Sequence, residues 1–230
     1  MQINKTTIDF RTIRRFIDSG QQVILFIRHS ERPPISTTDK SFGKNLGLTE
    51  YGIEMCHEAG SRFSGLMDVD FYASPMERCR RTAKHFAEGM GLPDSVKVSN
   101  APQIGIEGFY MHPDYHALQT LMKERGYMEY MEEYLNNGTA PYLNNIHSST
   151  EKTIEWMQSV SKSQFSVFVS HDIYITAFIT SLGIRTFHGG DWIGFLHAAA
   201  LCVNPENGEI NCYHAVPCLE SHKEPATFFQ

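Results

Sequence analysis

The sequence has few of the features that mark secreted, membrane or metal-binding proteins. Its five cysteines are odd in number and scattered, and no two form a CxxC pair, so we expect neither a disulfide framework nor a zinc site. No apolar run is long enough to cross a membrane, and arginines interrupt the first 22 residues, where a signal peptide would need an apolar core. We therefore predict a soluble, cytoplasmic protein.

The sequence also has little excess charge of either sign. The 230 residues carry a formal net charge of −6, which leaves no basic excess for nucleic acid or an anionic membrane. The sequence has neither a GxSxG nucleophile elbow nor a P-loop, so the usual signatures of serine hydrolases and P-loop nucleotide hydrolases are missing. Any anion site must therefore be a local cluster of positive side chains.

What the sequence does contain is an alternation of apolar runs and amphipathic segments. The runs at 23–27, 69–73 and 165–169 are typical of strands buried on both faces of a parallel sheet. Helices are predicted over 6–19, 49–65, 76–88, 148–162 and 172–182. This alternation predicts an α/β fold, a three-layer α/β/α sandwich with a mostly parallel sheet. A terminal hairpin of strands at 193–203 and 209–216 would add one antiparallel edge strand.

Residues 109–147 differ in character from the rest of the chain. They contain six tyrosines and two helical stretches, near 114–125 and 127–136. We interpret this segment as a helical lid inserted into a single domain that spans residues 1–230. Most of the tyrosines are expected to form the small core of the insertion, with one or two facing a ligand.

Ionisable clusters follow three of the predicted strands. They are residues 28–32 (RHSER), 74–78 (SPMER) and 170–172 (SHD). Ligands of open parallel sheets bind in the crevice beyond the carboxyl ends of the strands. We therefore expect these three segments to meet at one edge of the sheet.

The basic side chains of these clusters suit a phosphoryl group. The planar guanidinium groups of Arg28, Arg32 and Arg78 match phosphate oxygens bidentately. Phosphoryl transfer needs such groups to stabilise the charge on the equatorial oxygens. His171 can add a further contact, so the sequence predicts a phosphate-binding pocket.

The same clusters contain a nucleophile and an acid. A neutral imidazole is a competent nucleophile near pH 7, which suggests His29 for the attack on phosphorus. The leaving alkoxide would then take a proton from a carboxyl group. Asp172, next to His171, is the first candidate for this acid.

Four motifs resemble those of a known superfamily. Residues 28–34 (RHSERPP) look like the RHGxRxP signature of the histidine phosphatase superfamily, in its acid-phosphatase branch. Residues 74–83 (SPMERCRRTA) resemble its SPxxRxxxTA segment, and 170–172 resemble its histidine-aspartate motif. Residues 48–52 (LTEYG) are similar to the LTxxG segment that lies between the first two. All four occur in the order that the superfamily has.

The resemblance implies a phosphoglycerate mutase-like fold and a metal-independent phosphomonoesterase without a cofactor. It implies a phosphohistidine intermediate on His29, phosphate contacts from the three arginines and His171, and Asp172 as proton donor. The mutase branch instead takes its acid from a glutamate in mid-chain, and Glu107 could play that part here. Ser30 departs from the pattern, where glycine is usual, and would tighten the pocket or add a hydrogen bond.

Two other functions stay open at this point. A phosphotransferase of the phosphoglycerate mutase type would return the phosphoryl group to a second hydroxyl of its substrate. A non-catalytic phosphoanion-binding protein would keep the pocket without turnover. In every case the expected partner is a phosphorylated small molecule or a phosphoprotein, with no nucleic acid and no membrane involved.

Overall fold

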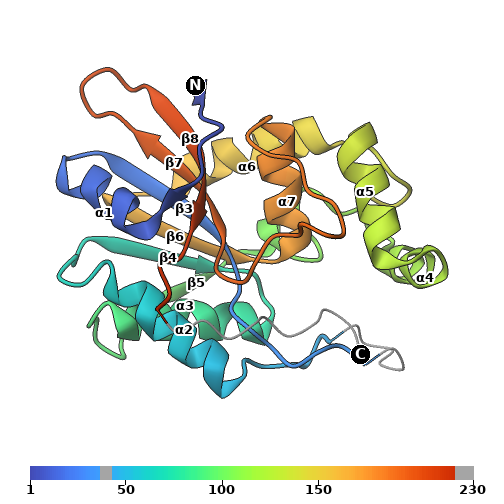
Figure 1. Ribbon diagram of the computed structural model, residues 1–230, viewed down its shortest axis with the longest axis horizontal. Coiled ribbons are helices and arrows are strands. Elements are labelled where there is room, and N and C mark those ends of the chain that lie inside the picture. The colour runs from blue at the N-terminus through green and yellow to red at the C-terminus, as the bar shows by residue number, and fades with distance from the viewer. Residues whose placement is uncertain (37–42, 221–230) are drawn as a thin grey trace.

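The computed structural model describes residues 1–36 and 43–220, which form an open sheet with helices on both faces (Figure 1). Its strands are β1 (Gln2–Ile3), β2 (Ile8–Asp9), β3 (Gln22–Arg28), β4 (Val69–Ala73), β5 (Val98–Asn100), β6 (Phe165–Ser170), β7 (Ala198–Val203) and β8 (Ile210–Val216). Its helices are α1 (Phe10–Asp18), α2 (Glu50–Ser61), α3 (Glu77–Gly89), the 3₁₀ helix η1 (Pro102–Ile104), α4 (Tyr115–Arg125), α5 (Tyr127–Asn137), α6 (Ile146–Val160) and α7 (Asp172–Ser181). The predicted α/β/α class is confirmed.

The order of the strands is β1-β8-β7-β3-β6-β4-β5, and β2 also pairs with β8. Every pair is parallel except the two that β7 makes, with β3 and with β8. The expected antiparallel strand is thus β7, the first strand of the terminal hairpin. It lies inside the sheet and not at the edge as expected, because β8 follows it and the short strands β1 and β2 add to β8. Two-residue strands have no periodic pattern, so the sequence did not indicate them.

The two faces of the sheet pack against different helices, which explains why β3 is apolar throughout. Val23, Leu25 and Ile27 join one core with side chains of α1, α2 and α3. Ile24 and Phe26 join the other core with side chains of α4 to α7. Alternate residues of a strand point to opposite faces, so a strand covered on both sides needs apolar residues at every position. Polar side chains with a chemical role are therefore confined to the strand ends.

Helices α4 and α5 match the two helical stretches predicted within residues 109–147. Tyr110, Tyr130 and Tyr134 are fully buried there, as expected for tyrosines that form the core of the segment. Figure 1 shows both helices at one side of the molecule, and α5 packs against α7. The inserted segment therefore lies beside the helix that follows β6.

Two helices begin at residues other than those predicted, and in each the capping residue explains the difference. Helix α1 begins at Phe10, where the Asp9 side chain accepts a hydrogen bond of 2.7 Å from the backbone N–H of Thr12. Helix α6 begins at Ile146, where the Asn145 side chain accepts from the next backbone N–H groups. The helix predicted from residue 148 therefore begins two residues earlier, because asparagine is a strong N-cap residue.

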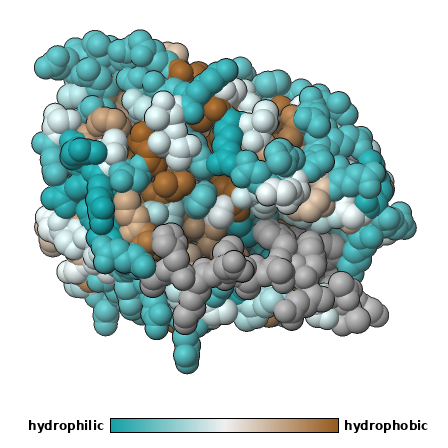
Figure 2. All heavy atoms as spheres, viewed as in Figure 1, coloured by the Kyte–Doolittle hydropathy of each residue, from teal (hydrophilic) through white to brown (hydrophobic). Residues whose placement is uncertain are grey.

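The surface of the described residues is mostly polar. Figure 2 shows hydrophilic side chains around the rim of one face, with hydrophobic ones gathered toward its middle. The large hydrophobic side chains that are exposed are those of Met1, Ile3, Met67 and Tyr142. Within residues 1–36 and 43–220, no helix combines the length and the hydropathy that crossing a membrane requires.

Candidate active site

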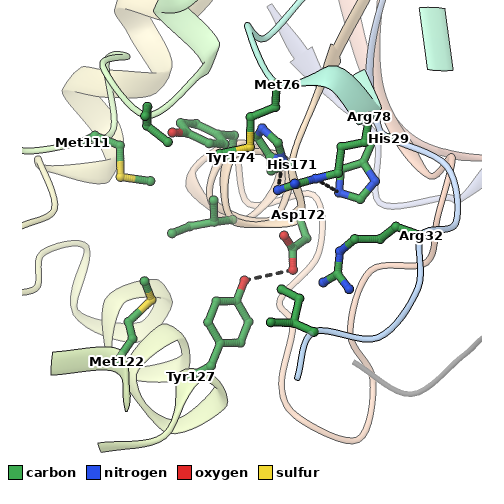
Figure 3. Close-up of a pocket in the computed structure, with 13 residues that line it drawn as sticks. His29, Arg32, Met76, Arg78, Met111, Met122, Tyr127, His171, Asp172 and Tyr174 are labelled. Carbon is green, nitrogen blue, oxygen red and sulfur yellow. Dashed lines mark hydrogen bonds between the residues drawn. The ribbon is translucent and has the colours of Figure 1, made fainter. Parts of the chain in front are cut away.

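A pocket lies beyond the carboxyl ends of β3 and β6, where α3 and α7 begin (Figure 3). Its polar lining comes from His29 and Arg32 after β3, from Arg78 in the first turn of α3, and from His171 and Asp172 at the start of α7. The rest of the described lining is apolar or aromatic. Three distant segments of the chain thus meet at one edge of the sheet, where parallel sheets bind ligands.

Arg78 connects the two histidines of the pocket. Its Nε lies 3.2 Å from Nε2 of His29, and its Nη2 lies 3.3 Å from Nδ1 of His171. Its Nη1 donates to the carbonyl of Gly43 at 2.7 Å. A guanidinium can only donate hydrogen bonds, so each histidine presents a lone pair to Arg78.

The tautomer of His29 follows from its two partners. Nδ1 lies 2.8 Å from the carbonyl oxygen of Ser30 and therefore carries the proton, while Nε2 accepts from Arg78. Burial lowers the pKa of His29 well below its usual value, and the charge of Arg78 adds to this effect. The ring is thus neutral near pH 7, with the lone pair of Nε2 directed at the guanidinium of Arg78, which lines the pocket.

His171 is held in a similar way. Its Nε2 lies 3.1 Å from the hydroxyl of Ser74, which follows β4, and its Nδ1 accepts from Arg78. Burial, together with Arg78, lowers the pKa of His171 well below the usual value. The ring centroids of His29 and His171 are 5.4 Å apart, so two neutral imidazoles face one end of the pocket.

Two further arginines lie at this end of the sheet, but in different places. Arg32 lines the pocket, and its pKa is lowered to about 10, mainly by burial and then by Arg78; it is still charged at neutral pH. Arg28, the last residue of β3, is buried but is not among the lining residues. Its Nη1 donates to the carbonyl of Ile193, and its Cζ lies 4.1 Å from the ring centroid of Phe195.

The two candidate acids are separated in space. Asp172 lines the pocket, and its Oδ2 accepts hydrogen bonds of 2.9 Å from the hydroxyl of Tyr127 and from Nε1 of Trp192. Glu107 is exposed and lines a neighbouring hollow together with Glu77. Of the two carboxyl groups, the pocket that contains His29 therefore includes only that of Asp172.

The smaller motif residues hold the segment after β3 in place. Thr82, from the second motif, accepts a hydrogen bond of 3.0 Å from the backbone N–H of Ser30. The hydroxyl of Ser30 is fully buried and donates to the carbonyl of Gly52 at 2.7 Å. Ser30 thus adds a hydrogen bond to helix α2 and is not among the residues that line the pocket. A side chain on Gly52 would lie 2.3 Å from the carbonyl oxygen of Glu31, so only glycine permits this approach.

Several residues of the site carried no distinct signal in the sequence. Tyr127 was one of many tyrosines in the inserted segment, although one or two were expected to face a ligand. Trp192 lies in a loop without a motif, and Ser74 reaches His171 only because β4 and β6 are neighbours. Burial and the Asp172 charge raise the pKa of Tyr127 well above its usual value, so it stays protonated and donates to the carboxylate.

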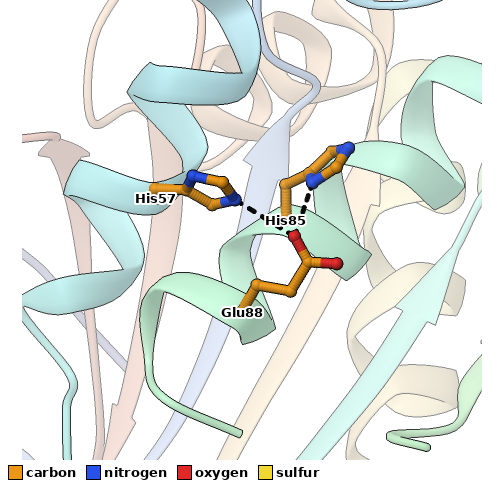
Figure 4. A group of neighbouring side chains, drawn as sticks. All are labelled: His57, His85 and Glu88. Atoms are coloured by element: carbon orange, nitrogen blue, oxygen red, sulfur yellow. Dashed lines mark hydrogen bonds and ion pairs between the residues drawn. The ribbon is translucent and has the colours of Figure 1, made fainter. Parts of the chain in front are cut away.

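The described residues contain one group of three side chains that could hold a metal ion, and it lies outside the pocket. It consists of His57 on α2 with His85 and Glu88 on α3 (Figure 4). None of the three is among the residues that line the pocket.

Comparison with known proteins gives the family. The sequence model of the histidine phosphatase superfamily (branch 1) matches residues 24–213, which is more than half of the chain. The predicted superfamily is confirmed, but the match is to branch 1 and does not support the finer expectation of the acid-phosphatase branch. A search of curated protein sequences found no match.

Solved structures of the same fold include phosphatases and a mutase. A mycobacterial glucosyl-3-phosphoglycerate phosphatase is similar at a TM-score of 0.54 and 13% identity, over 84% of this chain and 97% of that one. Phosphoglycerate mutase from Bacillus anthracis gives 0.54 and 12%, over 83% and 90%. A phosphoserine phosphatase variant from Entamoeba histolytica, in complex with phosphoserine, gives 0.52 and 17%, over 82% and 94%. At these identities the likeness shows the fold, and the sequence match gives the family: the chain belongs to the histidine phosphatase superfamily.

Proposed function

We propose that the protein is a metal-independent phosphomonoesterase that forms a phosphohistidine on His29. The observation that carries the proposal is the state of this side chain. Its ring is neutral, its Nδ1–H is bonded to a carbonyl, and the lone pair of Nε2 lies within a cluster of basic residues. A neutral nucleophile among positive charges is what attack on a phosphate dianion requires.

The first half of the reaction transfers the phosphoryl group to the enzyme. Arg78 exchanges its hydrogen bond to Nε2 of His29 for the phosphoryl oxygens, which Arg32 and His171 also contact, and the freed Nε2 attacks phosphorus. The bond from phosphorus to the alcohol oxygen breaks, and the alkoxide takes a proton from the carboxyl group of Asp172. Because Oδ2 of Asp172 is held by two donors, Oδ1 is the oxygen that carries this proton.

The second half returns the enzyme to its starting state. The Asp172 carboxylate takes a proton from water, and the water oxygen attacks the phosphorus of phosphohistidine. The bond from phosphorus to Nε2 of His29 breaks, inorganic phosphate leaves, and Asp172 is protonated again. The similar solved structures named above are phosphatases and a mutase, which supports phosphoryl chemistry on this fold. Asp172 in the pocket, with Glu107 outside it, favours hydrolysis by this route over the mutase alternative.

Substitution of the nucleophile tests the proposal. The His29→Ala variant should release phosphate from p-nitrophenyl phosphate at least about 10³-fold more slowly than the wild type. Rapid acid quenching of the wild type should not preserve a phosphoenzyme, whereas alkaline quenching should, because phosphohistidine is acid-labile. A chelator should leave turnover unchanged. His147→Ala is the matched control, because His147 lies on α6 and contacts Ser181 at the end of α7 that is far from the pocket. Turnover by His29→Ala at the wild-type rate would exclude the mechanism.

A further inference from the structure

The pocket has a polar side and an apolar side. Figure 3 shows His29, Arg32 and Arg78 on one side of Asp172, and Met111 and Met122 on the other. Met111 and Met122 line the apolar side, and Ile35, Met76, Ile106 and Ile173 are further apolar residues of the pocket lining. A substrate whose phosphoryl group contacts the basic residues must therefore place its alcohol part against thioethers and branched alkyl groups.

The aromatic residues of the pocket do not add polar groups for the substrate. The hydroxyl of Tyr127 donates to Asp172, and the hydroxyl of Tyr174 donates to the carbonyl of Gly105. Their rings are thus the parts that can contact a ligand. Among the described residues that line the pocket, Asp172 is the one charged side chain outside the basic cluster. No described cation lies on the apolar side to pair with a substrate carboxylate.

The cost of removing polar groups from water predicts which substrates the pocket prefers. A carboxylate, ammonium group or sugar hydroxyl placed on the apolar side would lose water without gaining a partner, which is costly. An alkyl or aryl group placed there would be favoured by burial, and methionine side chains adapt to its shape. We propose that the physiological substrate is the phosphate monoester of an apolar alcohol, an aryl or a bulky alkyl alcohol. This inference rests on the phosphomonoesterase function proposed above.

The test compares esters whose intrinsic reactivity is matched. Cyclohexylmethyl phosphate and hexyl phosphate, like glycerol 1-phosphate and O-phosphoserine, all release alkoxides, so differences in kcat/KM report on the pocket. We expect the two apolar esters to be at least about 10-fold better substrates. The Met122→Gln variant should lower the ratio of kcat/KM for hexyl phosphate to kcat/KM for glycerol 1-phosphate about 10-fold. Met67→Gln, at a methionine that is 73% exposed, is the control and should change neither.

A binding measurement separates this inference from the proposed function. Hexylphosphonate, which cannot be hydrolysed at the P–C bond, should bind at least about 10-fold more tightly than 3-hydroxypropylphosphonate in calorimetry. This preference without turnover of any ester would reject the phosphatase and keep the apolar pocket. Turnover of all four esters with equal kcat/KM, or a preference for the polar ones, would overturn the inference and leave the phosphatase standing.

A second inference concerns the group of His57, His85 and Glu88 (Figure 4). Two imidazoles and a carboxylate form one of the common ligand sets of zinc. Oε2 of Glu88 lies 3.1 Å from Nε2 of His57 and 2.7 Å from Nδ1 of His85. Ligands around tetrahedral zinc lie roughly 3.3 Å apart, so only small movements are needed. We infer that this group binds a divalent transition metal, with water completing the coordination.

The helices that carry these three side chains are packed closely enough to keep them together. A side chain on Gly60 of α2 would lie 2.1 Å from the carbonyl oxygen of Phe86, and one on Gly89 of α3 would lie 2.3 Å from that of His57. The two backbones therefore touch on both sides of the group. One charge opposes a cation: Lys84 lies 3.8 Å from Oε1 of Glu88. The Lys84 ammonium group thus lies near Oε1, whereas the two histidines contact Oε2.

Calorimetric titration of the full chain with Zn²⁺ tests this second inference. The wild type should bind one ion at this group, and His57→Ala and Glu88→Gln should each weaken that binding at least about 10-fold. His29→Ala serves as the control for ions held by the pocket and should keep the binding. Unchanged affinity in both variants, or no binding by the wild type, would overturn the inference.

Discussion

Tyr127 shows how a residue from the inserted segment reaches the chemistry of the site. It lies at the start of α5, yet its hydroxyl bonds Oδ2 of Asp172 at 2.9 Å. Trp192 contacts the same oxygen from the loop between α7 and β7. With one oxygen held by two donors, the carboxyl group has a defined orientation, which leaves its other oxygen for the proton transfer proposed above. Tyr127 is thus a positioning residue, because it acts through Asp172.

Removal of this hydroxyl should reduce turnover more than binding. We expect Tyr127→Phe to lower kcat about 10-fold, the effect of losing one hydrogen bond to a charged group, with little change in KM. Tyr72→Phe is a matched control, since the hydroxyl of Tyr72 bonds the carbonyl of Val160 away from the pocket. Steady-state kinetics with p-nitrophenyl phosphate measures both constants. An unchanged kcat in Tyr127→Phe would contradict the positioning role.

At the scale of elements, two helices begin at the pocket. Met76, the N-cap residue of α3, and His171, the N-cap residue of α7, both line it. A helix N-terminus carries a partial positive charge and free backbone N–H groups, which favours an anion there. The helices therefore reinforce the basic side chains in a protein whose net charge is −6.

Helix α2 does not line the pocket. It packs against the segment after β3 and supports it. Gly52, in its first turn, lies against the backbone of Glu31, and Thr49 caps the helix while its hydroxyl contacts Oε2 of Glu31 at 2.5 Å. The LTxxG segment is thus a packing motif. Its threonine and glycine join a helix start to the loop that carries His29.

A side chain at position 52 should therefore disrupt this junction. Gly52→Ala would place a Cβ 2.3 Å from the carbonyl oxygen of Glu31, and we expect a loss of about 3 kcal/mol in the free energy of unfolding. Because the loop with His29 must shift, kcat/KM should fall as well. Gly47→Ala is the control, since the nearest atom there is 3.0 Å away at the end of the Arg81 side chain. Equal urea midpoints for Gly52→Ala and the wild type would refute the close contact.

At the scale of the whole molecule, several histidines are buried in the neutral form. Burial lowers the pKa of His29 and His171 well below the usual value, that of His197 to about 3 and that of His214 to about 4. Near pH 6.5 and below, these histidines become protonated in the unfolded chain, whereas they stay neutral in the folded state. The unfolded state then binds more protons, so stability rises with pH in this range and is lost as the pH falls.

The free energy of unfolding should therefore decrease steeply from pH 7 to pH 5. Each histidine that stays neutral in the folded state contributes about 1.4 kcal/mol per pH unit between its folded and unfolded pKa values. Urea denaturation at a series of pH values measures the slope. His214→Gln should make it shallower, and His116→Gln, at an exposed position, should leave it unchanged. A slope of zero for the wild type between pH 6 and pH 5 would contradict the prediction.

The sequence by itself determined the order of the main elements and which residues meet. Strands such as β3 are covered on both faces, so they are apolar at successive positions and can be recognised in the sequence. Parallel strands place their carboxyl ends at one edge, which predicts that six residues lie together: Arg28, His29, Arg32, Arg78, His171 and Asp172. All of them except Arg28 line the pocket. The four motifs pointed to the superfamily for a related reason: three of them combine residues of the pocket with residues that pack its backbone, and the LTxxG segment packs that backbone from behind.

Only the tertiary structure decided which side chains turn into the pocket and what else lines it. Glu107 and Asp172 could not be distinguished by spacing, because the direction of a loop depends on packing that local sequence does not encode. The inward position of β7 arises because β1 and β2, from the start of the chain, pair with β8, which in turn pairs with β7. The apolar side of the pocket likewise combines residues from separate segments, and their common surface exists only once the inserted helices pack beside α7.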